Sequence, residues 1–220
     1  LYEIGVLKAE RVGCKVISIG NITTGGSGKT PLTMKVASFL KARGKKVVIL
    51  SRGYKRKTSG TVIVSDFDGV LAGHEDAGDE AYLMASILKG VPVIVSSDRV
   101  SAARRAISEF SADAVVLDDG FQHLRIMRDV NVVLIDAGKK LGTGHLLPRG
   151  VLREPLPGLL RADCFMIKGG GVPFEITGAG KPSFGFFYRP SALRCSDGSE
   201  RPRVQSKGRG LPFGTGPRKP

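Results

Sequence analysis

Short apolar runs rich in Val and Ile recur along the chain, and several of them lack alternating polar residues. Strands that read as continuous hydrophobic runs are buried on both faces, as in a parallel sheet flanked by helices. The runs predict strands at Val16–Ile19, Val47–Leu50, Thr61–Val64, Val91–Val95, Ala114–Leu117, Val130–Ile135, Cys164–Ile167 and Ser183–Tyr188.

Helical patterns lie between these runs. Leu32, Val36 and Leu40 fall on one face of a helix that ends near Gly44, and Ala81–Leu88 and Ser101–Phe110 predict two more. Strands and helices in alternation are typical of a doubly wound α/β fold. The sequence therefore predicts a parallel sheet with helices on both faces.

The character of the chain changes after about Gly169. We expect one α/β domain over residues 1–168 and a different segment over residues 169–200. From Arg201 onward there is no helical or strand period, only Arg, Lys, Gly and Pro in excess. We expect residues 201–220 to form a disordered basic tail.

The composition, 41% hydrophobic and 25% charged, is that of a globular chain and excludes a disordered or fibrous one. The formal net charge of +14 favours anionic partners: nucleotide phosphates, nucleic acid or an anionic membrane face. Only 6% of the residues are aromatic, which argues against binding nucleic acid by base stacking. The three cysteines are scattered, as in a protein of the reducing cytosol. No apolar run reaches the roughly 18 residues of a membrane span.

A phosphate-binding loop is predicted at Gly25–Thr30, between the strand Ile17–Gly20 and a helix. Glycines allow several backbone N–H groups to converge on phosphate oxygens at the helix N-terminus. Lys29 would reach the β- and γ-phosphates, and the Thr30 hydroxyl would bind magnesium. The strict motif has Gly where this chain has Thr23. The loop predicts ATP or GTP, bound with Mg2+.

Two adjacent carboxylates, Asp118 and Asp119, end the apolar strand at Ala114–Leu117. In phosphate-loop proteins such a strand lies beside the loop strand, and its terminal Asp holds magnesium or its water shell. The alternative is an exposed Asp-Gly turn. With the loop present, we favour the magnesium site. His123 follows near the same edge and is a candidate substrate-binding residue, although a lone His is more often structural.

Other charged residues also follow predicted strands or begin helices. Arg52 and Arg99 follow two strands, at the edge where parallel sheets bind ligands, and could bind anionic groups of a substrate. Asp79 lies at the start of a predicted helix, where acids are common because they interact favourably with the helix dipole. Spacing alone leaves these residues open between solvated and functional roles.

Together the motifs resemble those of the tetraacyldisaccharide 4′-kinase family. The motifs occur in the same order as in the family, from about Leu1 to about Lys168. The ordered set of motifs indicates the family far more specifically than any single motif does. The motifs are Gly20-Asn21-Ile22-Thr23, Gly25-Gly26-Ser27-Gly28-Lys29-Thr30-Pro31, Ser51-Arg52-Gly53-Tyr54, Ala77-Gly78-Asp79-Glu80, Asp98-Arg99, Asp118-Asp119-Gly120-Phe121-Gln122-His123 and Leu147-Pro148-Arg149-Gly150-Val151-Leu152-Arg153-Glu154-Pro155.

The resemblance implies a phosphate-loop kinase that phosphorylates the 4′-hydroxyl of tetraacyldisaccharide 1-phosphate, a lipid A precursor, with ATP and Mg2+. It implies a peripheral location at the cytoplasmic face of the inner membrane, on an anionic surface, and no nucleic-acid partner. The implied roles are catalysis by Asp79 and Lys29; ATP binding by Thr24, Gly25, Gly26, Ser27, Gly28, Lys29 and Thr30; magnesium binding by Thr30, Asp118 and Asp119; and substrate binding by Tyr54, Arg99 and Glu154.

The resemblance also implies a membrane-associated segment before Leu1 and a second, smaller lobe of which residues 169–200 would be the beginning. We therefore expect a truncated copy, whose activity stays open. A phosphate-loop ATPase acting as a regulator or a metal-delivery chaperone is the alternative, but the runs Asp118–His123 and Leu147–Pro155 argue against it. A nucleic-acid binder is a third class, weakened by the lack of aromatic residues among the basic ones.

Overall fold

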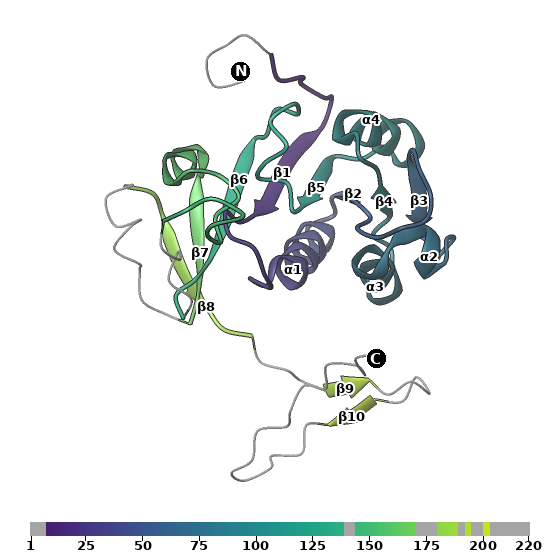
Figure 1. Ribbon diagram of the computed structural model, residues 1–220. Helices are drawn as coiled ribbons and strands as arrows, with labels where there is room; N and C mark the ends of the chain where they lie inside the picture. The colour runs from purple at the N-terminus through teal and green to yellow at the C-terminus, as the bar shows by residue number, and fades with distance from the viewer. Residues whose placement is uncertain (1–7, 139–143, 170–179, 189–191, 195–199, 203–220) are drawn as a thin grey trace. The chain divides into compact units, whose positions relative to one another are not determined.

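The computed structural model describes residues 8–138, 144–169, 180–188, 192–194 and 200–202 (Figure 1). The chain divides into two compact units, Leu1–Phe186 and Phe187–Pro220. In the second unit the structure describes a short antiparallel pair, β9 (Ala192–Arg194) with β10 (Glu200–Pro202). All of the other elements belong to the first unit.

The first unit is built on an eight-stranded sheet in the order β3-β4-β2-β5-β1-β6-β7-β8. Neighbouring strands are parallel, apart from β3, which is antiparallel to β4. The strands are β1 (Lys15–Gly20), β2 (Val47–Ser51), β3 (Val62–Ser65), β4 (Val93–Val95), β5 (Ala114–Asp118), β6 (Val130–Asp136), β7 (Cys164–Lys168) and β8 (Ser183–Phe186).

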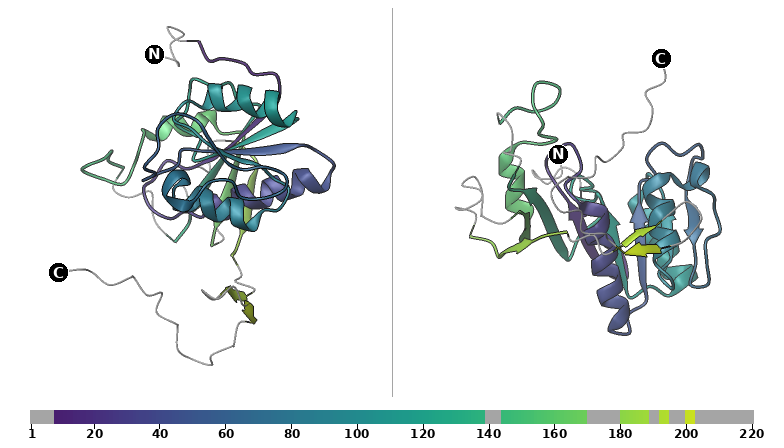
Figure 2. Two further views of the ribbon diagram at one scale, coloured as in Figure 1. Left: turned by 90° about the vertical axis from the view of Figure 1, so that its right-hand side faces the viewer. Right: turned by 90° about the horizontal axis from the view of Figure 1, so that it is seen from below.

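Helices cover both faces of the sheet, as Figure 2 shows. One face carries α1 (Lys29–Ala42) and α3 (Asp79–Ile87), and the other carries α4 (Arg99–Phe110). Two short elements complete the unit, the single turn α2 (His74–Ala77) and the 3-10 helix η1 (Leu156–Arg161). Among the described residues, no helix is both long and apolar enough to cross a bilayer.

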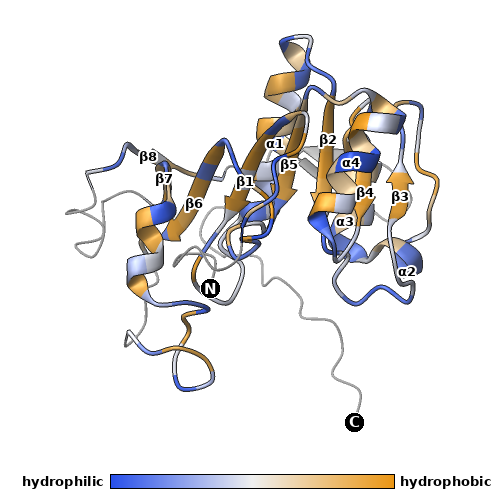
Figure 3. Ribbon diagram, turned by 90° about the horizontal axis from the view of Figure 1, so that it is seen from above, coloured by the Kyte–Doolittle hydropathy of each residue, from blue (hydrophilic) through white to orange (hydrophobic). Residues whose placement is uncertain are grey.

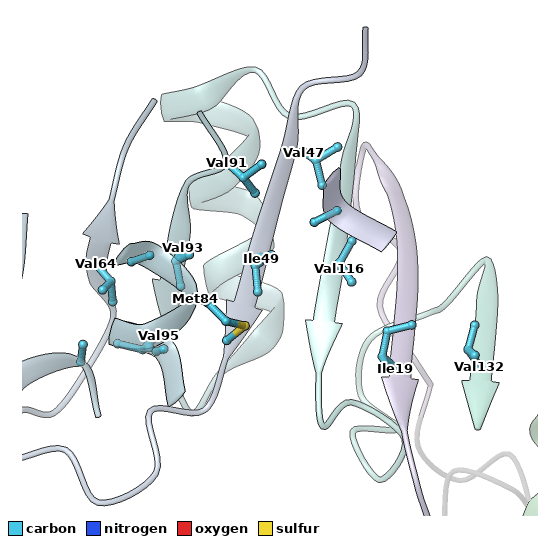
Figure 4. Packing of buried hydrophobic residues seen from close by; sticks show 14 of the residues in the cluster. Ile19, Val47, Ile49, Val64, Met84, Val91, Val93, Val95, Val116 and Val132 are labelled. Carbon is cyan, nitrogen blue, oxygen red and sulfur yellow. The ribbon is translucent and has the colours of Figure 1, made fainter. Parts of the chain in front are cut away.

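The side-chain alternation of the strands divides the core between the two faces. Ile19, Ile49 and Val116 project toward α1 and α3, where they join a cluster with Met84 of α3 (Figure 4). Their sequence neighbours project to the opposite face, where Leu50 and its equivalents pack against α4. The central strands are therefore mainly hydrophobic, with Ser18, Ser51 and Asp118 as buried polar exceptions, and Figure 3 shows the apolar colour concentrated in the strands.

A third hydrophobic cluster covers the β6–β7 half of the sheet. Phe165 of β7 and Leu159 of η1 are buried there with Ile22, Phe121 and Leu152. The last three come from loops at the carboxyl edge of the sheet. This cluster fixes the polar loops of that edge to the sheet.

The predicted fold class is confirmed, and each strand predicted from an apolar run is present, although some bounds differ. The first unit extends past the predicted boundary at Lys168, because β8 pairs with β7 in the sheet. The pattern gave no signal for α2, η1 or β9. β10 takes in Arg201 and Pro202, the first residues of the predicted tail; residues 203–220 lie outside the described part of the chain.

Candidate functional site

The predicted phosphate loop follows the carboxyl end of β1, next to the acidic end of β5. Ile19 of β1 is paired in register with Asp118 of β5, so the two strands end side by side. Gly20 allows this proximity, because a Cβ atom there would lie 2.5 Å from the Cβ of Phe121. The pairing of strands that are far apart in sequence thus brings the loop and the carboxylates together.

The loop leads directly into the N-terminus of α1. Gly28 is the N-cap residue of this helix and has φ 91°, a left-handed conformation that favours glycine. Inside the loop, the Asn21 side chain donates hydrogen bonds to the Ser27 hydroxyl at 3.0 Å and to the Thr23 carbonyl at 2.8 Å. Asn21 therefore fixes the loop from within, at a helix N-terminus, where backbone N–H groups and the helix dipole favour an anion.

Lys29 is the first residue of α1, and its ammonium group lies among oxygen acceptors. Nζ donates to Oδ1 of Asn21 at 3.1 Å and lies 3.4 Å from Oδ1 of Asp119. Thr30 follows it in the helix and is partly exposed. Lys29 and the carboxylate of Asp119 are therefore neighbours, and Thr30 is adjacent to Lys29 at the start of α1.

Asp118 is buried at the end of β5, and its hydrogen-bond donors among the described residues are neutral. The Thr33 hydroxyl donates to Oδ1 at 3.0 Å, and the Ser51 hydroxyl reaches Oδ2 at 3.5 Å. Burial raises the pKa of this carboxyl to about 6, and the neighbouring charges of Glu80 and Asp119 add to the effect. A carboxylate in this state gains from a cation.

Asp119 has the opposite environment, although it is the next residue. Its φ of 53° turns the chain out of β5, so that its side chain is partly exposed. Nη1 of Arg153 donates to both carboxylate oxygens, at 2.9 and 2.7 Å. Burial alone would raise the pKa of Asp119, but Lys29 and Arg153 outweigh it and lower this pKa. Asp119 is therefore an ion-paired carboxylate.

Arg153 belongs to a segment, Val151–Glu154, that we call the strap because it binds along the start of the phosphate loop. The backbone N–H of Arg153 donates to the Ile22 carbonyl at 2.7 Å, and that of Thr24 donates to the Val151 carbonyl at 2.8 Å. The strap thus connects the loop to Asp119 through both its backbone and a side chain.

Glu154, a predicted substrate-binding residue, has its carboxylate occupied by other side chains. Gln122 donates from Nε2 to Oε1 at 2.6 Å, and Nη2 of Arg161 donates to Oε2. The same amide nitrogen of Gln122 donates to the Asn21 carbonyl at 2.9 Å. Glu154 therefore lies on the loop side of the site and connects the strap to η1.

Arg99 and His123 lie on the other side of the site, where α4 begins. Arg99 is only 3% exposed, and Nη1 donates to the Ser96 carbonyl. Its Nε and Nη2 are buried without a hydrogen-bond partner in the described part of the chain. Burial lowers the pKa of this guanidinium to about 10, and Arg52 lowers it further, although Asp118 opposes the shift.

His123 is kept neutral by the same surroundings. Burial lowers its pKa to about 4, and the charges of Arg99 and Arg52 contribute. Together Arg99 and His123 line a pocket of about 210 Å³. The residues that line it are Ser97, Asp98, Arg99, Val100, His123, Arg125 and Ile126. Arg125 in this lining is paired with Asp98, whereas two nitrogens of Arg99 lack a hydrogen-bond partner in the described residues, so Arg99 is the group there that suits an anion.

Asp79 and Tyr54 come together at the carboxyl end of β2. A Cβ atom on Gly78 would lie 2.6 Å from the Tyr54 carbonyl oxygen, so the turn after β2 packs against the start of α3. Asp79 is the first residue of α3, and both side chains are exposed. Its neighbour Glu80 raises the pKa of Asp118, which places this helix end near the acidic edge.

Sequence reasoning did not assign roles to Asn21, Thr33, Gln122, Arg153 or Arg161. The partners of Thr33, Gln122 and Arg153 lie far away in the sequence, and single polar residues carry no periodic signal. Asn21, Gln122 and Arg153 do fall within the motifs that carry the family resemblance. Position in a motif is the one signal that could have selected them.

Magnesium fits the donor set formed by Thr30, Asp118 and Asp119. The described residues contain no group of three or more His, Cys, Asp or Glu side chains arranged to hold a metal. Magnesium, however, is commonly bound through one or two carboxylates together with substrate phosphates. The buried carboxylate of Asp118, which accepts a hydrogen bond from the Thr33 hydroxyl, is an oxygen ligand of the kind that magnesium prefers.

Comparison with known proteins decides the family. The sequence model of the family described as Tetraacyldisaccharide-1-P 4′-kinase matches residues 1–212. The chain belongs to this family. It is similar to the tetraacyldisaccharide 4′-kinases of Halothermothrix orenii, with 50% identity over 76% of the chain, and of Aquifex aeolicus, with 45% identity over 92%. It spans 44% and 63% of the lengths of these two relatives.

A solved structure agrees with this assignment. The crystal structure of LpxK from Aquifex aeolicus in complex with ATP matches with a TM-score of 0.76 and 40% identity. The match covers 92% of this chain and 63% of that one. The phosphate-loop kinase fold expected from the motifs is confirmed, and the family favours a kinase over an ATPase that acts as a regulator or chaperone.

Proposed function

We propose that this chain transfers the γ-phosphoryl group of ATP to the 4′-hydroxyl of tetraacyldisaccharide 1-phosphate, a step of lipid A biosynthesis. The observation that carries the proposal is the convergence of Lys29, Asp118 and Asp119 at one edge of the sheet. Membership of the kinase family supplies the acceptor.

On the nucleotide side, the backbone of Gly25–Thr30 and the Lys29 ammonium group would hold the phosphates of ATP. Thr30, Asp118 and Asp119 would hold Mg2+, which supplies neutralisation of the charge on the transferred phosphoryl group. Asn21 keeps the loop in shape through its bonds to Ser27 and Thr23. These residues position the γ-phosphate at the carboxyl edge of the sheet.

On the acceptor side, Asp79 would take the proton of the 4′-hydroxyl while the hydroxyl oxygen forms a bond to the γ-phosphorus. The bond between that phosphorus and the β–γ bridging oxygen breaks, and ADP leaves. Arg99 and His123 line a pocket that suits an anionic group of the acceptor, and the exposed Tyr54 would contact the sugar. For Glu154, the bonds to Gln122 and Arg161 favour a positioning role over direct contact.

A lipid acceptor implies work at a membrane. The net charge of +14 would attract the chain to an anionic inner-membrane surface, so we propose a peripheral location on its cytoplasmic side. The same charge does not require nucleic acid, because the acceptor and ATP are themselves anionic.

The proposal is tested with radiolabelled ATP, the acceptor in detergent micelles, and three chains: wild type, Lys29→Ala and Lys57→Ala. Lys57 is an exposed lysine remote in sequence from the loop and serves as the matched control. We expect transfer by the wild type and by Lys57→Ala, and loss of transfer by Lys29→Ala. Transfer that survives in Lys29→Ala, or a wild type that neither binds ATP nor transfers phosphate, would contradict the proposal.

A further inference from the structure

Arg153 is held at the nucleotide side of the site by bonds at both of its ends. Its backbone N–H donates to the Ile22 carbonyl, next to the phosphate loop. Its guanidinium donates from Nη1 to both oxygens of Asp119. Since Lys29 Nζ lies 3.4 Å from the same carboxylate, the guanidinium and the phosphate-binding lysine are neighbours.

Two cations of this cluster share one carboxylate. Asp119 lies against both Lys29 and Arg153, whereas Asp118 accepts hydrogen bonds from the hydroxyl groups of Thr33 and Ser51. An ammonium group and a guanidinium are therefore held close together beside the loop. A polyphosphate held by Lys29 would attract both cations, because a guanidinium carries five donors in a planar fork that suits phosphate oxygens.

The position of Arg153 selects which phosphate it can meet. In a phosphate loop the glycine-rich backbone surrounds the inner phosphates, whereas the lysine and the acidic strand end face the outer ones. Arg153 binds to the acidic strand end, through Asp119, and its contacts with the loop side involve its backbone. Its guanidinium is thus on the side of the terminal phosphate.

We propose that Arg153 is a catalytic residue that binds the terminal phosphate of ATP, exchanging all or part of its ion pair with Asp119 for phosphate oxygens. The inference rests on the proposed function. It adds a cation, supplied by the strap in the same chain, that stabilises the negative charge of the transferred phosphoryl group. In the nucleotide-free chain the same guanidinium holds Asp119 in place.

The test compares affinities for ATP and ADP, each with Mg2+, by competition against a fluorescent ATP analogue. The chains are wild type, Arg153→Ala, Arg153→Lys, Arg149→Ala and Lys29→Ala. Arg149 is an exposed arginine shortly before the strap and provides the matched loss of charge. We expect Arg153→Ala to weaken ATP binding about 10- to 100-fold and ADP binding only slightly. Arg153→Lys should lie between, since a lysine keeps the charge without the fork.

A merely structural role predicts a different pattern. If Arg153 served only to shape the loop, the Ala variant would lose ATP and ADP affinity equally, and that result would overturn the proposal. Unchanged ATP affinity in Arg153→Ala would overturn it as well. Failure of the proposed function is distinguishable, because the wild type itself would then show no Lys29-dependent binding of either nucleotide. Arg153→Lys, which retains the positive charge, keeps the test valid if the Ala variant does not fold.

Discussion

The two sides of the carboxyl edge of the sheet differ in whether their charged groups are ion-paired. On the nucleotide side, Lys29 and Arg153 are ion-paired with Asp119. On the acceptor side, Arg99 is almost fully buried, and two of its nitrogens have no hydrogen-bond partner in the described part of the chain. In the first region the cations are ion-paired within the protein, whereas in the second region a buried cation could still bind an anionic partner.

This difference has an energetic consequence. A ligand on the nucleotide side has to replace existing ion pairs, so binding and a local rearrangement occur together. An anion on the acceptor side would relieve an unfavourable buried charge, whose desolvation is incompletely compensated in the free chain. Buried Arg99 on the acceptor side therefore lowers the stability of the free protein, whereas the ion-paired Asp119 on the nucleotide side does not.

Lys29→Ala should have the largest effect. Removing the ammonium group takes away a charge-assisted contact with the phosphates, and we expect ATP affinity to fall about 100-fold, or about 3 kcal/mol. Isothermal titration calorimetry measures this, with Lys57→Ala as the exposed control. If the ATP affinity of Lys29→Ala stayed within a factor of three of the wild-type value, the loop would not be the nucleotide-binding site.

Arg99→Met should separate stability from function on the acceptor side. A side chain of similar length without the charge should stabilise the free chain by about 1–2 kcal/mol, after loss of the bond to the Ser96 carbonyl. Chemical denaturation measures the gain, and acceptor binding in micelles should weaken in the same variant. If Arg99→Met were less stable than wild type, the desolvation cost of the buried guanidinium would be fully compensated by its interactions in the protein.

Asp118→Asn should change the pH dependence of stability. The folded pKa of about 6 lies above the ordinary value of 3.8, so this group destabilises the fold as pH rises through 6. The Asn variant should match wild type below about pH 4 and exceed it by about 1–2 kcal/mol at pH 8. Denaturant midpoints at both pH values test this, and nucleotide binding by the variant should lose its dependence on Mg2+. If the Asn variant were less stable than wild type at pH 8, the predicted direction of the stability change would be wrong.

His123→Gln should have the smallest effect, with the opposite sign. The folded pKa of about 4 lies below the ordinary 6.5, so the neutral ring contributes stability that is lost as pH falls from about 6.5 to 4. The variant should lose less stability over this pH range than wild type does. The difference should be on the order of 1 kcal/mol, a small effect because the ring is only partly buried. Thermal midpoints measured across that range, with Arg125→Gln from the same pocket as the control, check the prediction. An unchanged profile would show that neither burial nor the neighbouring arginines lower the pKa of His123 in the folded chain.

Local patterns were sufficient for much of the fold. The apolar runs at β2 and β5 predicted strands buried on both faces, because a parallel sheet covered by helices requires hydrophobic side chains on each side. Short elements such as η1 were missed, since a 3-10 turn with prolines has no sustained period. The loop Gly25–Thr30 and the carboxylates after β5 were predicted as well, because each is a compact motif with its own chemistry.

The fold class, the phosphate loop and the family resemblance could be predicted from apolar runs and short motifs, each made of residues close together along the chain. The tertiary structure was needed to show how the adjacent carboxylates differ, with Asp118 buried under hydroxyl groups and Asp119 bound by Arg153. It also decided that Arg99 is a buried cation. Burial and ion pairing depend on which distant segments meet, and that information does not lie in the local order of residues.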